Sequence, residues 1–145
     1  MTSFFVPGTP VAKGSAKSFW NPKAKRIVTM QDNRERQKPW ASMISYTAQQ
    51  YCKPFSGPVN LTLHFYMPRP KNHYGIGHKA SILKATAPTL HTSRPDLDKL
   101  CRLVKDALTG MAWIDDSQVC QMKASKEYRH TPGVNITIDR DITAV

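Results

Sequence analysis

Carboxylates are the residues of this chain whose positions say most about its chemistry. Ten of the 145 residues are acidic, and half of these ten fall between positions 94 and 119. The five are Asp96, Asp98, Asp106, Asp115 and Asp116. Carboxylate oxygens are hard ligands that suit Mg²⁺ or Mn²⁺. A chain that gathers its few acids in one stretch is therefore expected to use them together on a divalent cation.

The rest of the chain is strongly basic. It has 21 Lys and Arg residues and a formal net charge of +11, with a pI near 9.8. Such an excess favours a polyanionic partner, either a nucleic acid or an anionic surface. Carboxylates that bind a divalent cation within a basic protein predict a metal-dependent enzyme that acts on nucleic-acid phosphates.

The spacing of Asp96 and Asp98 indicates where a helix starts. Pro95 holds Arg94 in an extended conformation, and an apolar face with a helical period begins at Leu97. Side chains two residues apart diverge by about 200° in a helix but point to the same side in extended chain. We therefore expect the two carboxylates to straddle the start of the helix and to face one site.

A helix cap is the alternative explanation for these acids. Ser93 or Asp98 is expected to be the N-cap, and the positive end of the helix dipole stabilises carboxylates near it. Capping accounts for one acid of the pair. Capping does not account for the other acid of the pair together with Asp115 and Asp116, which lie just past the other end of the helix.

The predicted elements alternate between strands and helices. Strands are expected at 3–6, 59–67, 119–125 and 134–138, and helices at about 32–52, capped by Asp32 or Asn33, and at about 98–110. The basic segment 13–26 has no clear period and is expected to be a loop or a ragged hairpin, whereas 68–93 is a long loop. The pattern predicts an α/β fold. It is a single domain over residues 1–145, with a mixed sheet and helices packed on one face.

Cysteine usage and hydropathy indicate the compartment. The three cysteines are odd in number and lack CxxC spacing, so zinc and disulfides are not expected and a reducing cytosol is the simplest location. No apolar run approaches the roughly 20 residues that span a bilayer, and the N-terminus lacks the layout of a secretion signal. We expect a cytoplasmic protein without a membrane partner.

Several segments resemble the RusA family of Holliday junction resolvases, which are bacterial and phage endonucleases. They are RPDLDKL at 94–100, DALTG at 106–110, WIDDSQV at 113–119 and VPGTPVAKG at 6–14. The resemblance spans nearly the whole chain and implies a RusA-like fold. It also implies a homodimeric, Mg²⁺-dependent endodeoxyribonuclease that nicks opposed strands of a four-way DNA junction symmetrically, in recombination and repair or in phage DNA processing.

The resemblance assigns roles to the acidic residues. It implies that Asp96, Asp98 and Asp116 are the essential carboxylates and hold Mg²⁺, for which Mn²⁺ can substitute. Asp115 would be an accessory member of the same metal-binding group and would hold the turn.

One position departs from the family pattern. The resemblance implies an essential lysine four residues after the second aspartate, where this chain has Arg102. Arginine can stabilise phosphate charge, but it stays protonated and cannot shuttle a proton. If a proton must move, Lys99 or Lys126 has to replace it. Arg102 and Lys126 are therefore both candidate catalytic residues.

Basic residues of the two irregular segments are the candidates for binding DNA phosphates. They are Lys13, Lys17, Lys23, Lys25, Arg26, Arg69, Lys71 and Lys79. The first segment also carries Phe19 and Trp20, which are able to stack on bases. A solvated, mobile loop is the alternative interpretation of that segment.

Three other functions are compatible with these patterns. The first is a non-catalytic DNA-binding or recombination accessory protein of the same fold. The second is another Mg²⁺ phosphodiesterase, such as an RNase or a flap nuclease. The third is an interaction module in which the aspartates are only helix caps.

Overall fold

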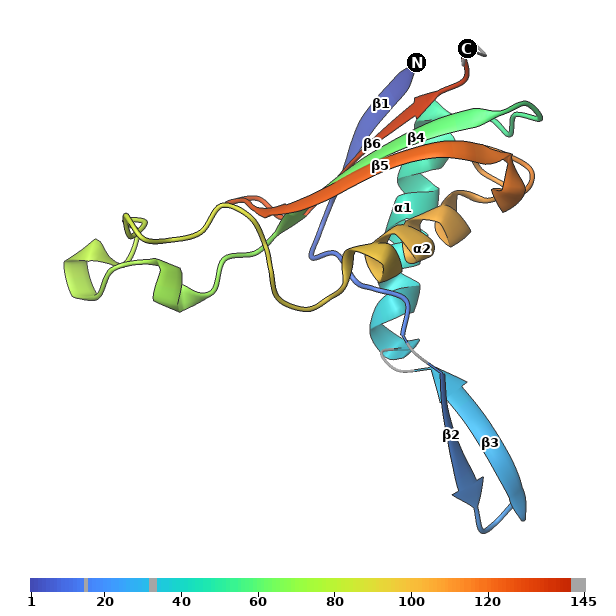
Figure 1. Cartoon of the computed structure of the whole chain (residues 1–145), viewed down its shortest axis with the longest axis horizontal. Helices are drawn as coiled ribbons and strands as arrows, with labels where there is room; N and C mark the ends of the chain where they lie inside the picture. Colours follow the sequence, from blue (N-terminus) through green and yellow to red (C-terminus); the bar gives the residue numbers. More distant parts are fainter. Residues whose placement is uncertain (15, 32–33, 142–145) are drawn as a thin grey trace.

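The centre of the molecule is a four-stranded sheet with the strand order β1-β6-β4-β5. The computed structural model describes residues 1–14, 16–31 and 34–141. The strands are β1 (Thr2–Pro7), β4 (Val59–Met67), β5 (Val119–Tyr128) and β6 (Gly133–Asp139), shown in Figure 1. β6 pairs antiparallel with β1 and β4, whereas β4 and β5 are parallel. The predicted mixed sheet is confirmed.

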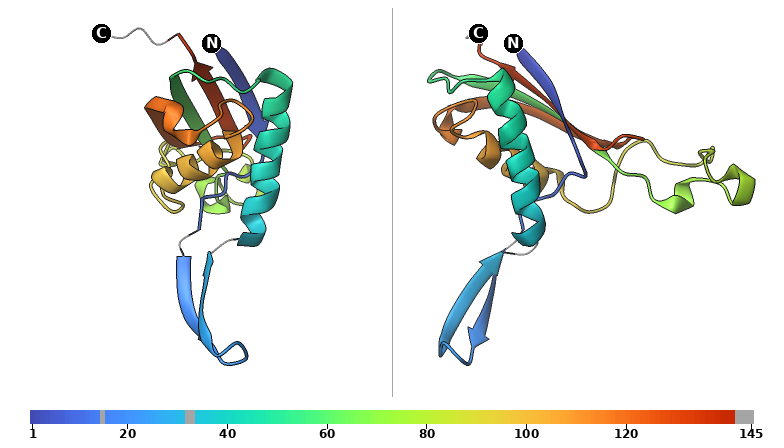
Figure 2. Two further views of the ribbon diagram at one scale, coloured as in Figure 1. Left: turned by 90° about the vertical axis from the view of Figure 1, so that its right-hand side faces the viewer. Right: turned by 180° about the vertical axis from the view of Figure 1, so that it is seen from behind.

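Strand β4 explains why the two helices cover one face of the sheet. Its odd-numbered residues from Val59 to Met67 are apolar and buried, and the residues between them are partly exposed. Successive side chains in a strand point to opposite faces, so one face of β4 is a continuous apolar surface. Helices α1 (Arg34–Tyr51) and α2 (Leu97–Leu108) lie against that face, as the left view of Figure 2 shows.

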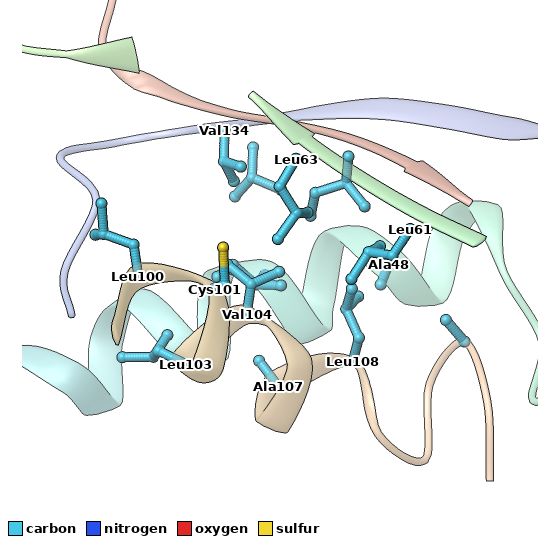
Figure 3. Packing of buried hydrophobic residues seen from close by; sticks show 14 of the residues in the cluster. Ala48, Leu61, Leu63, Leu100, Cys101, Leu103, Val104, Ala107, Leu108 and Val134 are labelled. Carbon is cyan, nitrogen blue, oxygen red and sulfur yellow. The ribbon is translucent and has the colours of Figure 1, made fainter. Parts of the chain in front are cut away.

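Helix α2 packs its apolar side against β4. Leu100, Val104 and Leu108 are fully buried and lie toward Leu61 and Leu63 of β4 in Figure 3. Their three- and four-residue spacing is the helical period that the sequence predicts. Because one side of α2 is committed to the core, the acidic and basic residues of this helix are confined to its exposed side.

Helix α1 ends close to the predicted residue. The expected caps Asp32 and Asn33 lie outside the described residues, and α1 is described from Arg34 onward. Pro39 lies inside the helix, in its second turn. Trp40 and Ile44 point into the core.

Two projections extend away from this sheet and its helices, in different directions (Figures 1 and 2). The first is an antiparallel hairpin of β2 (Ala16–Asn21) and β3 (Arg26–Gln31); of the two predicted alternatives for 13–26, the hairpin is the one observed. The second is an arm over residues 68–93, with short 3₁₀ turns η1 (Lys71–His73) and η2 (Gly77–Lys79).

The state of the cysteines and the length of the apolar helices are the other two features that the sequence analysis addressed. All three cysteines are free thiols. None of the helices found in the described ranges is long and apolar enough to cross a membrane.

Candidate active site

Helix α2 begins at Leu97, so the N-cap position is held by Asp96. Asp96 has extended backbone angles, φ −69° and ψ 141°, and its carbonyl accepts a hydrogen bond from Leu100 N at 3.1 Å. The prediction that Ser93 or Asp98 is the N-cap is therefore wrong. The reason is that the chain becomes helical one residue before Asp98, which places Asp98 within the first turn.

The carboxylate of Asp96 makes no capping hydrogen bond to α2. Its side chain is 60% exposed, and its Oδ2 lies 3.8 Å from Lys99 Nζ. Asp98 is also exposed. Both carboxylates lie at the start of α2. Two exposed carboxylates at one helix start are oxygen ligands available to a cation.

Asp98, Arg102 and Lys105 form one stripe along the exposed side of α2, here called the α2 stripe. At 100° per residue, positions four and seven residues after Asp98 lie within about 40° of it around the helix axis. Lys105 Nζ in turn lies 3.5 Å from Asp116 Oδ2. Asp98 and Lys105 are about 10 Å apart along the axis. Asp116 is therefore linked to the α2 stripe through Lys105.

The predicted metal site requires its ligand side chains to lie close together. Within residues 1–14, 16–31 and 34–141, no three acidic, His or Cys side chains lie close enough together to hold a metal ion. Mg²⁺ is commonly held by one or two carboxylates together with substrate phosphates and water. Asp96 and Asp98 fit that donor set. Asp116 has one buried oxygen, Oδ1, without a hydrogen-bond partner in the described residues.

Asp115 fixes the turn that carries Asp116. Its Oδ1 accepts a hydrogen bond from Ser117 N at 2.8 Å, at the start of the 3₁₀ turn η3 (Asp116–Gln118). Hydrogen bonds from the backbone and then the side chain of Ser117 lower the pKa of the Asp115 carboxyl. Asp115 is thus engaged by its own turn, as expected for an accessory residue.

Gln118 is a residue that the sequence analysis missed. Its Oε1 accepts hydrogen bonds from Ile114 N and Asp115 N, both at 2.8 Å. Its Nε2 donates to Phe55 O at 2.6 Å and to Gly57 O at 2.8 Å. One amide thus joins the Asp115–Asp116 turn to the segment before β4. The signal was present, because an acidic residue followed by Gln three positions later is a capping-box pattern.

Lys126 holds the chain in position just before α2. From strand β5 its Nζ donates to Ser93 O at 2.7 Å and to Pro95 O at 2.8 Å. These two carbonyls belong to the residues three positions and one position before Asp96. An ammonium group has three donors, so two of the three are used in fixing the backbone beside the candidate carboxylates.

A cleft of about 970 Å³ opens beside Asp96. Its lining includes three cations, Arg36, Arg94 and Lys99, and the apolar segment 10–12. His91 also lines it. The cleft therefore combines positive charge and apolar surface next to the candidate carboxylates.

His91 is the buried polar residue of this cleft. Its side chain is 7% exposed. Burial is the main cause that lowers the pKa of the imidazole, and the charge of Lys126 lowers it further. The lowered pKa favours the neutral form of His91.

Two of the predicted DNA-binding residues have partners within the protein. Lys13 Nζ lies 2.6 Å from Asp106 Oδ2. Arg69 donates to Pro88 O at 2.8 Å, and its guanidinium lies 5.3 Å from the ring centroid of Tyr128. Both cations therefore also fix the segment on which they lie.

The other predicted DNA-binding residues lie on the projections. Five of them are exposed: Lys23, Lys25 and Arg26 at the turn of the β2–β3 hairpin, and Lys71 and Lys79 in the arm. Lys17 lies in β2, and its side chain is outside what the structure describes. The two projections thus carry exposed positive charge and extend in different directions (Figure 1).

Exposed carboxylates at a helix start, bordered by cations and by two basic projections, place the chain in the class of proteins that act on nucleic acids. The sequence model described as Endodeoxyribonuclease RusA matches residues 7–139. YqaN of Bacillus subtilis (strain 168), described as an uncharacterized protein, is 35% identical over 146 residues, and the alignment covers 97% of this chain and 96% of YqaN. The chain belongs to the RusA family of endodeoxyribonucleases, as its sequence resemblance indicates.

Proposed function

We propose that the protein is a Mg²⁺-dependent endodeoxyribonuclease that resolves four-way DNA junctions by paired, symmetric nicks. The observation that carries this proposal is the position of Asp96 and Asp98. In a chain of the RusA family, two exposed carboxylates stand at the start of α2, neither needed to cap it, beside a cleft lined by cations.

The residues at the start of α2 have distinct roles in this proposal. Asp96 and Asp98 would hold Mg²⁺, or Mn²⁺ in its place, which would supply an activated water and neutralise charge on the phosphate. Arg102 is exposed one turn beyond Asp98 and donates hydrogen bonds to the scissile phosphate. Asp116 would contribute the third carboxylate from the η3 turn.

Lys126 acts in this proposal as a positioning residue. Its ammonium fixes Ser93 O and Pro95 O, which sets the direction in which the Asp96 carboxylate leaves the backbone. Arg102 cannot transfer a proton. A proton relay by a lysine would therefore fall to Lys99, whose Nζ lies 3.8 Å from Asp96 Oδ2, since Lys126 is engaged by two carbonyls.

The basic projections hold the arms of the junction in this proposal. The hairpin turn and the arm carry exposed Lys and Arg residues on different sides of the site, and the chain has a net charge of +11. Contacts to phosphates fix position and carry no sequence information. Recognition of the junction would therefore follow its shape.

A homodimer fits the symmetry of the substrate. A two-fold axis relates two identical sites in a dimer, and a four-way junction offers two equivalent phosphates. Each subunit would cut one of two opposed strands, which gives paired nicks.

The decisive experiment uses a synthetic four-way junction, with and without Mg²⁺. We expect paired nicks from the wild-type protein, and loss of cutting in Asp98→Asn while junction binding survives, because the substitution removes a metal ligand and little volume. Asp141→Asn, an equal change of charge at an exposed residue near the C-terminus, is the matched control and should cut normally. Unchanged cutting by Asp98→Asn would exclude Asp98 as a ligand.

The ion pair between Asp116 and Lys105, which engages one of the carboxylates assigned to the metal, favours one other candidate, a DNA-binding accessory protein that kept the fold. In that case the wild-type protein would bind the junction equally with and without Mg²⁺ and cut in neither condition. Removal of Asp98 would then strengthen binding slightly, because it lowers repulsion of the phosphates.

A further inference from the structure

The β2–β3 hairpin presents a large apolar pair to solvent. Trp20 and Ile27 are directly opposed across the two strands, and their side chains are 60% and 70% exposed. On the other face of the ribbon Phe19 faces Val28, and Phe19 is also half exposed. A two-stranded hairpin that buries neither face is only marginally stable by itself, so this one gains stability from a partner that covers it.

The turn of the hairpin is well formed. Asn21 Oδ1 accepts hydrogen bonds from Lys23 N and Ala24 N at 2.9 and 3.2 Å, and Lys25 N donates to Asn21 O at 2.8 Å. Lys25 has a positive φ of 52°. The side chains of Lys23, Lys25 and Arg26 are exposed around this turn. The apolar pair is therefore flanked by a fixed group of cations.

The charge of this segment identifies the chemistry of its partner. Residues 1–31 contain no acidic side chain. An interface between two proteins usually pairs charges of both signs. This hairpin carries only positive charge, which complements a polyanion. Exposed aromatic and apolar side chains beside cations are suited to stacking on bases or to wedging between base steps.

The base of the hairpin is fixed to α2. Lys13 N donates to Lys99 O at 3.1 Å, and Lys13 Nζ lies 2.6 Å from Asp106 Oδ2. Trp20 is seven residues further along the chain, so it lies at most about 25 Å from this attachment. DNA bound at the start of α2 is therefore within reach of the hairpin.

We propose that Trp20 and Ile27 form a stacking surface for bases that are unpaired or splayed at a DNA branch point. This inference rests on the proposed function. It names the residues that would make the protein prefer branched DNA to linear duplex. In linear duplex every internal base is stacked on its neighbours, and opening a step costs a few kcal/mol. At a branch point the continuity of stacking is already broken, so the pair binds there at a smaller cost.

Tryptophan fluorescence without metal tests this contact directly. Trp40 and Trp113 are 5% and 0% exposed, so Trp20 is the tryptophan that DNA can reach. We expect a four-way junction to quench this emission and linear duplex of equal length to quench it far less. Trp20→Phe should remove the signal and keep most of the affinity, because the phenyl ring still stacks.

Affinity measurements give the second readout. Trp20→Ala is expected to weaken junction binding about tenfold or more, in line with the loss of one base stack, and to weaken duplex binding by no more than about twofold. Tyr46→Ala, which removes an aromatic side chain that is 65% exposed on α1, is the control and should change neither. Trp20→Ala should also leave the salt dependence of binding unchanged, because no charge is lost.

Three results would overturn the inference. They are equal losses on junction and duplex, which would indicate a groove contact; unchanged junction affinity in Trp20→Ala; and a changed oligomeric state of Trp20→Ala without DNA, which would indicate that a second copy covers the hairpin. Cutting is measured separately. A wild-type protein that binds the junction but never cuts it would refute the proposed nuclease. The fluorescence experiment would still test whether Trp20 contacts the DNA.

Discussion

Arg102 is the residue at which this chain departs from its family, and its surroundings favour a role through charge. It is exposed on the α2 stripe between Asp98 and Lys105. A guanidinium stays protonated at all working pH values and presents several donors to phosphate oxygens. Its contribution would therefore be to stabilise negative charge that develops on the phosphate.

Substitution of Arg102 separates charge from proton transfer. We expect Arg102→Lys to keep or raise the rate of junction cutting, because the positive charge is retained. Arg102→Gln should lower the rate by about 10²-fold or more, the scale for loss of one group that stabilises transition-state charge. Single-turnover cutting in Mg²⁺ measures both. Total loss of activity in Arg102→Lys would instead mean that the fork geometry of arginine is used.

His91 links folding stability to pH. Its pKa in the folded protein is lower than the ordinary 6.5, so on acidification the unfolded chain binds a proton before the folded chain does. The stability contributed by neutral His91 is present above about pH 6.5 and is lost as the pH falls toward the folded pKa. We expect the melting temperature of His91→Gln to fall less between about pH 7 and pH 5 than that of the wild type.

The control for this experiment is His78→Gln, which changes an exposed histidine of η2. It should keep the wild-type dependence of melting temperature on pH. If His91→Gln and the wild type lost the same number of degrees on acidification, the buried imidazole would not be a source of acid sensitivity.

At the scale of elements, one short turn connects the acidic pair to the sheet. η3 and the start of β5 are joined to the segment before β4 through the side chain of Gln118. The position of Asp116 thus depends on the side-chain amide of Gln118, which lies in the same turn.

Loss of the Gln118 amide should be costly for folding. Gln118→Ala leaves two backbone N–H groups and two carbonyls without these partners, and we expect a loss of about 2–3 kcal/mol in the free energy of unfolding. Urea denaturation measures the change. Gln121→Ala, at an exposed position of β5, should change stability by less than about 0.5 kcal/mol. An equally small effect at Gln118 would mean that water replaces the amide.

At the scale of the whole molecule, the chain is a compact sheet and two helices with two charged projections. The sheet and helices hold the carboxylates, and the two projections extend well away from them (Figure 1) and carry exposed Lys and Arg residues. Positive charge spread over separate elements binds a branched polyanion more readily than a single patch does, because each arm of the junction has its own phosphates.

The salt dependence of DNA binding counts these contacts. Each cation that neutralises a phosphate contributes about 0.9 to the slope of log affinity against log salt. We expect the double substitution Lys23→Ala and Lys25→Ala to lower the slope by about 2, equally for junction and linear duplex. Lys53→Ala, at an exposed lysine outside both projections, should leave the slope as it is. Unchanged slopes in the double variant would show that the hairpin turn does not touch phosphate.

Much of the fold follows from local patterns in the sequence. The apolar alternation from Val59 to Met67 and the helical period from Leu97 to Leu108 predict β4 and α2 because burial of one face sets the period of each element. For the hairpin the sequence permits two alternatives, because Trp20 and Ile27 bury no face and so leave no periodic signal. The predicted N-cap is wrong, since local sequence permits several helix starts and packing selects one.

The sequence by itself determined which residues can do chemistry: the acidic cluster in a basic chain, the DxD pair before an amphipathic helix, and the family motifs that cover most of the length. Only the tertiary structure decided how these residues meet. It pairs Asp116 with Lys105 of α2, engages Asp115 in its own turn, and gives Lys126 two backbone carbonyls to hold. The reason is that residue type fixes charge and ligand chemistry locally, whereas distances between side chains on different elements depend on how the helices pack against the sheet.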